Sequence, residues 1–278
     1  MNKSSKRFIN RVIPNCPDQK IPVRTEWVGY FLELQGFKSK LVGDPAWYDL
    51  DYIDKSFHNP DHINQIVFTP PHKRFYLNQA KEILKRLSVN FEESKKIISF
   101  QSALKGIDRE IRQFAKKYGW TVKYTSHDTE NIEFYRQSDL HVGYRKHGHL
   151  AHLRWRRPSI VLAEDSRAMG LTDTFGTAGF PAFESRFSAR TTHKIMNISQ
   201  LGPISGCESL LNSCSFSEKL PIKERKVAKP NQNITSNLIK FLNIQLENNW
   251  NSYDKVQKKI DKTYHYGMKP FIENILSI

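Results

Sequence analysis

The sequence is poor in cysteine and has no long hydrophobic run. Cys16, Cys207 and Cys214 are its three cysteines, and they lack the Cys-x-x-Cys spacing of a thiolate metal site. No apolar run approaches the roughly 20 residues that a membrane-spanning helix needs. The basic first residues lack the apolar segment of a secretory signal. These absences argue against a disulfide-stapled secreted domain and predict a cytoplasmic protein.

Positive charge is abundant and spread along the whole chain. There are 43 Lys+Arg against 28 Asp+Glu, a net charge of +15, and 38% of the 278 residues are hydrophobic. That apolar content is enough for a packed core, so we expect one large domain or two modest ones. The surplus of positive charge favours an anionic partner: nucleic acid, an acidic membrane surface, a phosphorylated substrate or an acidic glycan. Because the basic residues form no single tail, the pattern disfavours nucleic acid.

Strands and helices alternate regularly from residue 65 onward. Runs rich in β-branched and aromatic residues predict strands at 65–69, 96–100, 121–125, 139–144 and 159–163. Apolar residues at helical spacing predict helices at 76–87, 102–118 with Ser102 as the cap, 129–137 and 148–156. Strands that alternate with helices form a parallel sheet covered on both faces. The predicted fold class is α/β, a Rossmann-like doubly wound parallel sheet.

The rest of the chain predicts flanking segments around that domain, which we place at 61–190. The pattern over residues 1–22 predicts a basic mobile arm broken by prolines. The pattern over residues 23–60 predicts a short helix at 24–36 followed by a strand. Residues 191–234 are rich in Ser, Gly, Pro and Lys, as in a loop or linker. The apolar stripe of Leu238, Phe241 and Leu242 predicts C-terminal helices over 235–278 that pack on the core, with a membrane-facing stripe as the alternative.

Basic residues and histidines follow the predicted strands, at the edge where open parallel sheets bind ligands. Arginine can grip a carboxylate or phosphate with paired N–H donors, and histidine can donate a proton near pH 7. A helix that begins near Gly148 adds free backbone N–H groups. Together these features predict a pocket for a small, multiply charged anion. Its candidate residues are Lys73, Arg74, His127, Arg145, Lys146, His147, Gly148 and Arg167.

Four histidines, His141, His147, His149 and His152, crowd one stretch of the sequence. His149 and His152 are three residues apart, a spacing at which two side chains of a helix can bind the same metal ion. However, the stretch between His141 and His152 holds no carboxylate or cysteine, and cations surround it, so we predict no metal site. We expect His141, inside a strand, to be a core residue, and His152 to pack on its helix.

The segment SDLHVGYRKHGHLAHLRWRRPSIVLAEDSRAMGL (138–171) resembles the signature of the polysaccharide pyruvyl transferase family. Members of that family carry Arg-Leu-His-Gly after a strand, where this chain has Arg145-Lys146-His147-Gly148. Ser126-His127-Asp128 is similar to a His and Asp pair of the family, and the similarity spans roughly residues 24–185. The resemblance implies a GT-B-like fold, in which two Rossmann-like lobes enclose a cleft, with 61–190 as the C-terminal lobe and 23–60 as a remnant of the N-terminal one.

The resemblance also implies an activity: transfer of pyruvate from phosphoenolpyruvate to a sugar of a surface polysaccharide or glycan. By motif, Arg145 would hold the carboxylate or phosphate of the donor. His147 would be the general acid that protonates its methylene carbon. No cofactor is implied beyond phosphoenolpyruvate as donor substrate. The implied partner is a glycan or a lipid-linked sugar. A lipid-linked acceptor implies peripheral contact of the protein with the inner face of a membrane. The resemblance leaves open whether the protein forms a homo-oligomer.

The chain departs from the family pattern in three places. Lys146 replaces the Leu of the motif. Thr69-Pro70-Pro71 stands where relatives place an Arg, with Lys73 or Arg74 as substitutes. Too few residues precede Gly36 for a complete N-terminal lobe, so we expect a truncated or divergent member. The alternatives are a GT-B glycosyltransferase that uses a nucleotide sugar, and a non-enzymatic basic module that binds nucleic acid or acidic glycan, with Trp155 among arginines as its stacking surface.

Overall fold

Two compact units make up the chain, one of residues 46–261 and one of residues 1–45 together with 262–278. The structure is a computed structural model, and it describes residues 20–34, 36–101, 106–126, 130–176, 178–184 and 229–277. Most of the predicted arm (1–22) and most of the predicted linker (191–234) lie outside the described residues, as do Ser102 and His127.

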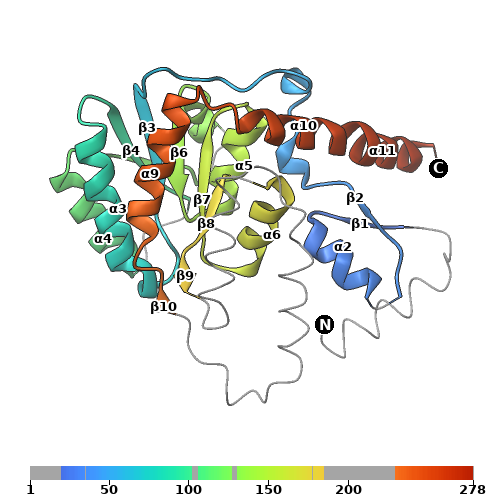
Figure 1. Cartoon of the computed structure of the whole chain (residues 1–278), viewed down its shortest axis with the longest axis horizontal. Coiled ribbons are helices and arrows are strands. Elements are labelled where there is room, and N and C mark those ends of the chain that lie inside the picture. The colour runs from blue at the N-terminus through green and yellow to red at the C-terminus, as the bar shows by residue number, and fades with distance from the viewer. Residues whose placement is uncertain are drawn as a thin grey trace, which may run out of the picture. The chain divides into compact units, whose positions relative to one another are not determined.

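A six-stranded parallel sheet forms the centre of the larger unit (Figure 1). Its strands are β3 (Gln65–Thr69), β4 (Lys95–Phe100), β5 (Thr121–Tyr124), β6 (Leu140–Gly143), β7 (Ser159–Ala163) and β8 (Gly179–Pro181). Their spatial order, β5-β4-β3-β6-β7-β8, is the order of the Rossmann fold, in which the chain builds one half of the sheet and then returns to build the other. The α/β class and the five predicted strands are confirmed, and β8 is a sixth strand that the sequence pattern did not indicate.

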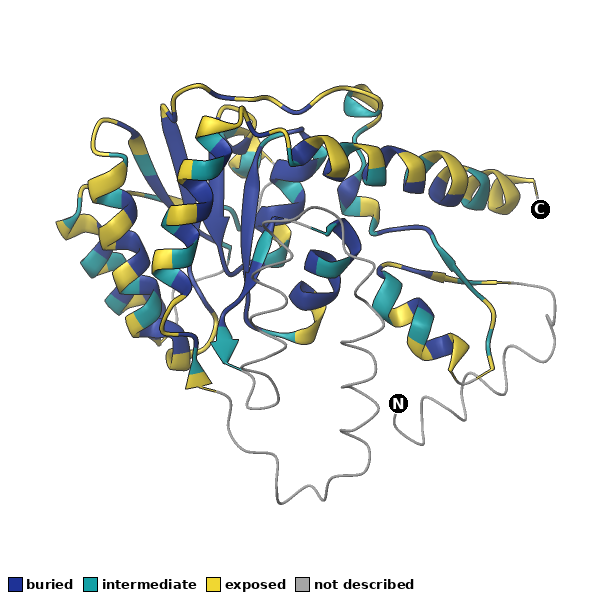
Figure 2. Cartoon of the chain, in the orientation of Figure 1, coloured by how far each residue is buried: buried dark blue, intermediate teal, exposed yellow. Residues whose placement is uncertain are grey.

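Helices cover both faces of this sheet, and alternate side chains of each strand meet different helices. Phe68 packs in a core with Leu84 and Leu238, whereas its neighbour Val67 packs with Tyr135 and Trp155. Figure 2 shows the central strands of the sheet as buried, and β3, β6 and β7 are buried along their whole length. The covering elements are α3 (Leu77–Asn90), α4 (Ile107–Lys117), the 3-10 helix η5 (Glu130–Tyr135), α5 (Lys146–Arg154), α6 (Ser166–Phe175), α9 (Ile234–Glu247) and α10 (Tyr253–Thr263).

Helix α9 and most of α10 belong to the core of the larger unit. Leu238 and Leu242 of α9 are fully buried, and Phe241 is 8% exposed, so the predicted core stripe is confirmed. The hydroxyl of Tyr253 on α10 donates to the carbonyl of Ser159 at 2.8 Å and accepts the N–H of the same residue at 3.1 Å. Short elements complete the unit. They are η3 (Leu50–Tyr52), η4 (Arg74–Tyr76), β9 (Phe183–Glu184) and β10 (Lys229–Pro230).

The smaller unit contains one strand–helix–strand repeat. Its strands β1 (Ile21–Val23) and β2 (Ser39–Leu41) pair in parallel, with α2 (Glu26–Glu33) between them in sequence. The π-helical η7 (Tyr264–Met268) and α11 (Lys269–Leu276) complete it, and η2 (Pro45–Trp47) begins at its boundary. β1 includes residues 21 and 22, which the sequence placed in the arm because Pro22 interrupts the short apolar run.

No helix in the described ranges combines the length and the apolar content needed to cross a membrane.

Candidate functional site

The reversal of strand order between β3 and β6 locates the candidate site. From β3 the chain continues to β4 on one side, and from β6 it continues to β7 on the other. In open parallel sheets, ligands bind outside the carboxyl ends of the strands at such a switch point. Three loops leave the sheet there: 70–73 after β3, 144–145 after β6 and 164–165 after β7.

A close contact between β3 and β6 fixes the start of α5. A Cβ atom on Gly143 would lie 2.5 Å from the carbonyl oxygen of Thr69 and 2.6 Å from its nitrogen, so only glycine fits at the end of β6. The hydroxyl of Thr69 accepts the backbone N–H of Arg145 at 3.3 Å, and Arg145 is the N-cap of α5. The first turn of α5 therefore lies against the end of β3.

The Arg145 side chain is anchored in the loop after β3 and is only 6% exposed. Its Nε donates to the carbonyl of Pro70 at 2.7 Å, and Nη2 donates to that of Pro71 at 3.5 Å. Nη2 also lies 4.0 Å from the Asp108 carboxylate. Burial lowers the pKa of Arg145, and the nearby Glu164 and Asp108 carboxylates oppose that shift. Within the described part of the chain, Nη1 has no hydrogen-bond partner, which leaves one edge of the guanidinium available to an anion.

Lys146, His147 and Gly148 form the first turn of α5, which begins two residues earlier than predicted. His147 is exposed there, two residues from the buried Arg145. A Cβ on Gly148 would come within 3.0 Å of His141 and Thr69, so this glycine lets the helix pack on the strand ends. The first N–H groups of a helix have no partner within it, and together they favour an anion.

The other predicted site residues are spread over neighbouring loops, and two of them are paired with carboxylates. Arg74 lies 3.2 Å from Glu110, and Arg167 lies 2.6 Å from Asp165. The hydrogen bond from Lys81, together with the charge of Arg74, lowers the pKa of Glu110. Lys73 is exposed, and His127 lies outside the described residues. The edge is thus less cationic than the sequence implies, because acidic side chains from other elements pair with its arginines.

The fold brings together at this edge a histidine and a glutamate to which the sequence pattern assigned no role. His72, after β3, and Glu164, after β7, are 92 residues apart in the chain, and His72 Nδ1 lies 2.6 Å from Glu164 Oε1. Tyr76 lies close by, and burial, with the charges of Glu164 and Asp165, raises its pKa to about 12. Both His72 and Glu164 lie at predicted strand exits, but their pairing depends on a long-range contact with no local signal.

Three of the four clustered histidines are buried where α5 packs on the sheet: His141 lies on β6, and His149 and His152 lie on α5. The hydroxyl of Ser159 lies 2.7 Å from Nδ1 of both His141 and His149, and His152 Nδ1 donates to the carbonyl of Gly148 at 2.8 Å. Burial lowers the pKa of His149 and of His152 to about 3, so both rings are neutral. The core role predicted for His141 is confirmed. Among the residues that the structure describes, no three His, Cys, Asp or Glu side chains are arranged to hold a metal ion.

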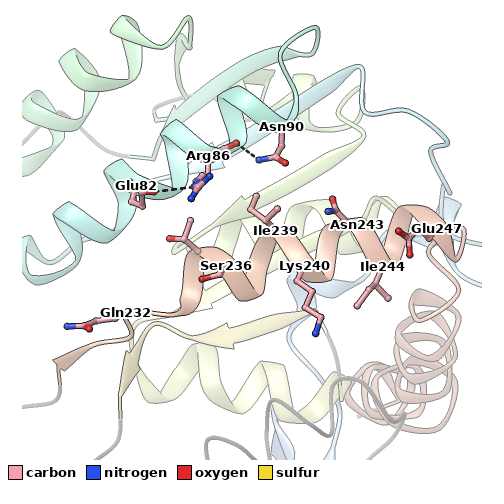
Figure 3. Close-up of a pocket in the computed structure, with 11 residues that line it drawn as sticks. Glu82, Arg86, Asn90, Gln232, Ser236, Ile239, Lys240, Asn243, Ile244 and Glu247 are labelled. Carbon is pink, nitrogen blue, oxygen red and sulfur yellow. Dashed lines mark hydrogen bonds and ion pairs between the residues drawn. The ribbon is translucent and has the colours of Figure 1, made fainter.

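A separate groove of about 640 Å³ runs between α3 and α9 (Figure 3). Arg86 on α3 pairs with Glu82 at 3.4 Å, and the α9 side carries Lys240 and Glu247, so positive and negative charges balance along it. The groove lies along the helices that cover the sheet, and it contains none of the predicted site residues. Its lining residues are Glu82, Arg86, Asn90, Gln232, Thr235, Ser236, Ile239, Lys240, Asn243, Ile244 and Glu247.

Comparison with known families places the switch-point residues in context. A family model described as polysaccharide pyruvyl transferase matches residues 2–166, more than half of the 278-residue chain. No curated protein matches the sequence. The matched region contains Thr69, the first turn of α5, and Glu164 at the end of β7. The chain belongs to the polysaccharide pyruvyl transferase family.

Proposed function

We propose that the protein transfers the pyruvyl group of phosphoenolpyruvate to a sugar of a polysaccharide or glycan. The observation that carries the proposal is the guanidinium of Arg145 at the switch point. It is held by the carbonyls of Pro70 and Pro71 and has Nη1 available beside the first N–H groups of α5. A buried, fixed arginine next to a helix start suits a small molecule with a carboxylate and a phosphate.

In the proposed reaction, His147 donates a proton to the methylene carbon of the donor. The adjacent carbon then carries positive charge that sugar hydroxyls attack, and phosphate leaves. Arg145 holds the anionic groups of the donor while charge shifts onto the phosphate, which is the electrostatic role that a preorganised cation performs. His147 suits the acid role because its side chain is exposed at the first turn of α5, where an incoming donor meets it.

We also propose that the smaller unit corresponds to part of the N-terminal lobe of a GT-B-like fold. Its β1-α2-β2 segment, with two parallel strands, is the repeat from which a Rossmann-like lobe is built.

The donor can be identified by thermal stabilisation and phosphate release. Phosphoenolpyruvate at a hundredfold excess over Kd should stabilise the folded protein by about 2.7 kcal/mol and raise its melting temperature. With a suitable member of a panel of glycan acceptors, it should also release inorganic phosphate. Stabilisation by a nucleotide diphosphate instead, with no effect of phosphoenolpyruvate, would identify a nucleotide-sugar glycosyltransferase and overturn the proposal.

Variants of Arg145 and His147 separate donor binding from turnover. Arg145→Lys keeps the charge but loses the fork that bonds the loop and the anion, so it should abolish stabilisation by phosphoenolpyruvate. His147→Gln should keep that stabilisation and lower kcat by about 10²–10⁴-fold, as expected for loss of a general acid. Arg86→Lys, in the groove between α3 and α9, is the matched control and should behave as wild type. Normal turnover in both site variants would show that the assignment of these residues is wrong.

A further inference from the structure

Two histidine–carboxylate pairs lie at opposite edges of the same sheet. His58 Nε2 lies 3.2 Å from Asp139 Oδ1, and His72 Nδ1 lies 2.6 Å from Glu164 Oε1. Asp139 precedes β6, and it also accepts the backbone N–H groups of Asn64 and Gln65 at the start of β3. That first pair therefore joins strands at the amino edge, away from the candidate site.

The His72–Glu164 pair lies at the carboxyl edge, within the candidate site. His72 follows Pro71, whose carbonyl accepts a hydrogen bond from Arg145. Glu164 directly follows β7, is 6% exposed, and is close enough to Arg145 to influence its ionisation. The buried Glu164 carboxylate thus contacts a histidine on the neighbouring loop and lies near the guanidinium that we assign to the donor.

The hydrogen bonds of Glu164 fix which nitrogen of His72 carries the proton. The carboxylate accepts the backbone N–H of His72 at 3.2 Å and faces the ring Nδ1 at 2.6 Å. Because an ionised carboxylate can only accept, Nδ1 must donate, and the lone pair of the neutral ring is then on Nε2. The side chain is 60% exposed, and Nε2 has no partner among the residues of the described ranges. A carboxylate that holds Nδ1–H and leaves Nε2 open is the arrangement of a general base.

We propose that His72, oriented by Glu164, is the general base that takes the proton of the acceptor hydroxyl. This proposal rests on the proposed pyruvyl transfer. As a sugar oxygen bonds to the central carbon of the donor, its O–H electrons stay on oxygen and its proton moves to His72 Nε2. The methylene carbon has gained a proton from His147. A second sugar hydroxyl then displaces phosphate, which leaves with the C–O electron pair and takes up that hydroxyl's proton. Exchange with solvent returns both histidines to their starting states.

Steady-state kinetics test the role, with the pair at the opposite edge as the matched control. His72→Gln should lower kcat at least 100-fold while KM and thermal stabilisation by phosphoenolpyruvate stay within about threefold of wild type. Glu164→Gln, which alters a positioning residue, should lower kcat about tenfold with KM unchanged. His58→Gln should keep the wild-type kcat. If the wild-type protein turns over phosphoenolpyruvate and the His72→Gln variant is equally active, the assignment of His72 as general base is wrong. The proposed function would still hold in that case.

The tautomer of His72 gives a second readout that does not need activity. In ¹⁵N-histidine-labelled full-length protein, long-range ¹H–¹⁵N spectra should show His72 with its proton on Nδ1, and Glu164→Gln should weaken that preference. If the wild-type protein releases no phosphate from phosphoenolpyruvate with any acceptor, the proposed function fails. The spectra then test only whether Glu164 holds the proton of His72 on Nδ1. A proton on Nε2 of the neutral His72 ring in the wild-type protein would overturn the proposed orientation of His72 by Glu164.

Discussion

His141 on β6 and His149 and His152 on α5 are buried as neutral rings where this helix packs on the sheet. Burial lowers the pKa of His149 and His152 to about 3, and that of His141 falls well below its ordinary value for the same reason. Ordinary histidines in an unfolded chain take up a proton near pH 6.5. Below that pH, the unfolded state binds protons that the folded state excludes, and the folded state loses stability until the pH approaches 3.

We therefore predict a marked loss of stability between pH 7 and pH 5. Each of His149 and His152 should lower the free energy of unfolding by about 2 kcal/mol over this interval, and His141 should act in the same direction. Urea denaturation at the two pH values measures the loss. His152→Gln should remove about 2 kcal/mol of it, whereas His62→Gln, at an exposed position, should leave it unchanged. An equal loss in wild type and His152→Gln would contradict the assignment of the effect to the buried rings.

At the level of residues, the sequence predicts those features of the site that depend on neighbouring positions in the chain. His141 lies in an apolar strand, so its core role follows from the pattern around it, and residues 145–148 lie together because they are consecutive. The pairing of His72 with Glu164, and that of Arg74 with Glu110, depends on how β3, β7 and α4 are placed by the fold. Periodicity and spacing carry no information on such contacts, which is why the sequence overstated the positive charge of the edge.

The contact between β3 and β6 is the element-level feature that shapes the site. Gly143↔Thr69 is the last paired position of these strands, and a Cβ on Gly143 would meet backbone atoms of Thr69 at 2.5–2.6 Å. Backbone cannot move aside as a flexible side chain can, so the strands must separate to admit a methyl group. Thr69 would then lose its position under the N–H of Arg145.

Gly143→Ala should consequently destabilise the protein by about 3 kcal/mol, at the upper end of the cost of overpacking. The same change should abolish stabilisation by phosphoenolpyruvate, because the start of α5 moves with β6. Chemical denaturation and a thermal shift with the donor measure the two effects. Ala151→Gly is a useful comparison within α5: it costs only about 1 kcal/mol through helix propensity and should preserve donor binding. A Gly143→Ala variant as stable as wild type would refute the close packing.

Elements with strong local patterns were predictable, and short or mixed ones were not. The five predicted strands consist of β-branched and aromatic runs. In contrast, β8 is Gly-Phe-Pro and β1 is Ile-Pro-Val, sequences that hold strand geometry only through their neighbours. The helix predicted for 129–137 is a 3-10 helix at Glu130–Tyr135, and the C-terminal helices predicted over 235–278 are α9, α10, the π-helical η7 and α11.

At the scale of the whole molecule, the chain beyond the family match completes the core. The match ends at residue 166, yet Trp250, Tyr253, Val256 and Ile260 are fully buried in the larger unit. Arg156 and Asp261 form a buried ion pair within it, and Arg156 Nε donates to the carbonyl of Lys55 at 3.1 Å. Removing one partner of such a pair leaves a buried charge uncompensated. Helix α9 and most of α10 are thus part of the structural unit that holds the site.

Removal of residues 229–278 should therefore prevent folding of the larger unit, although none of the proposed site residues is lost. Each fully buried side chain of α9 and α10 contributes about 1.5–3 kcal/mol, and a domain has only about 5–15 kcal/mol in total. Calorimetry of the shortened chain should show no cooperative transition. Ending the chain at Met268 instead removes α11, which has no buried residue, and should leave the main transition and stabilisation by phosphoenolpyruvate nearly unchanged. A cooperative transition in the chain that lacks 229–278 would mean that the matched region folds without its C-terminal helices.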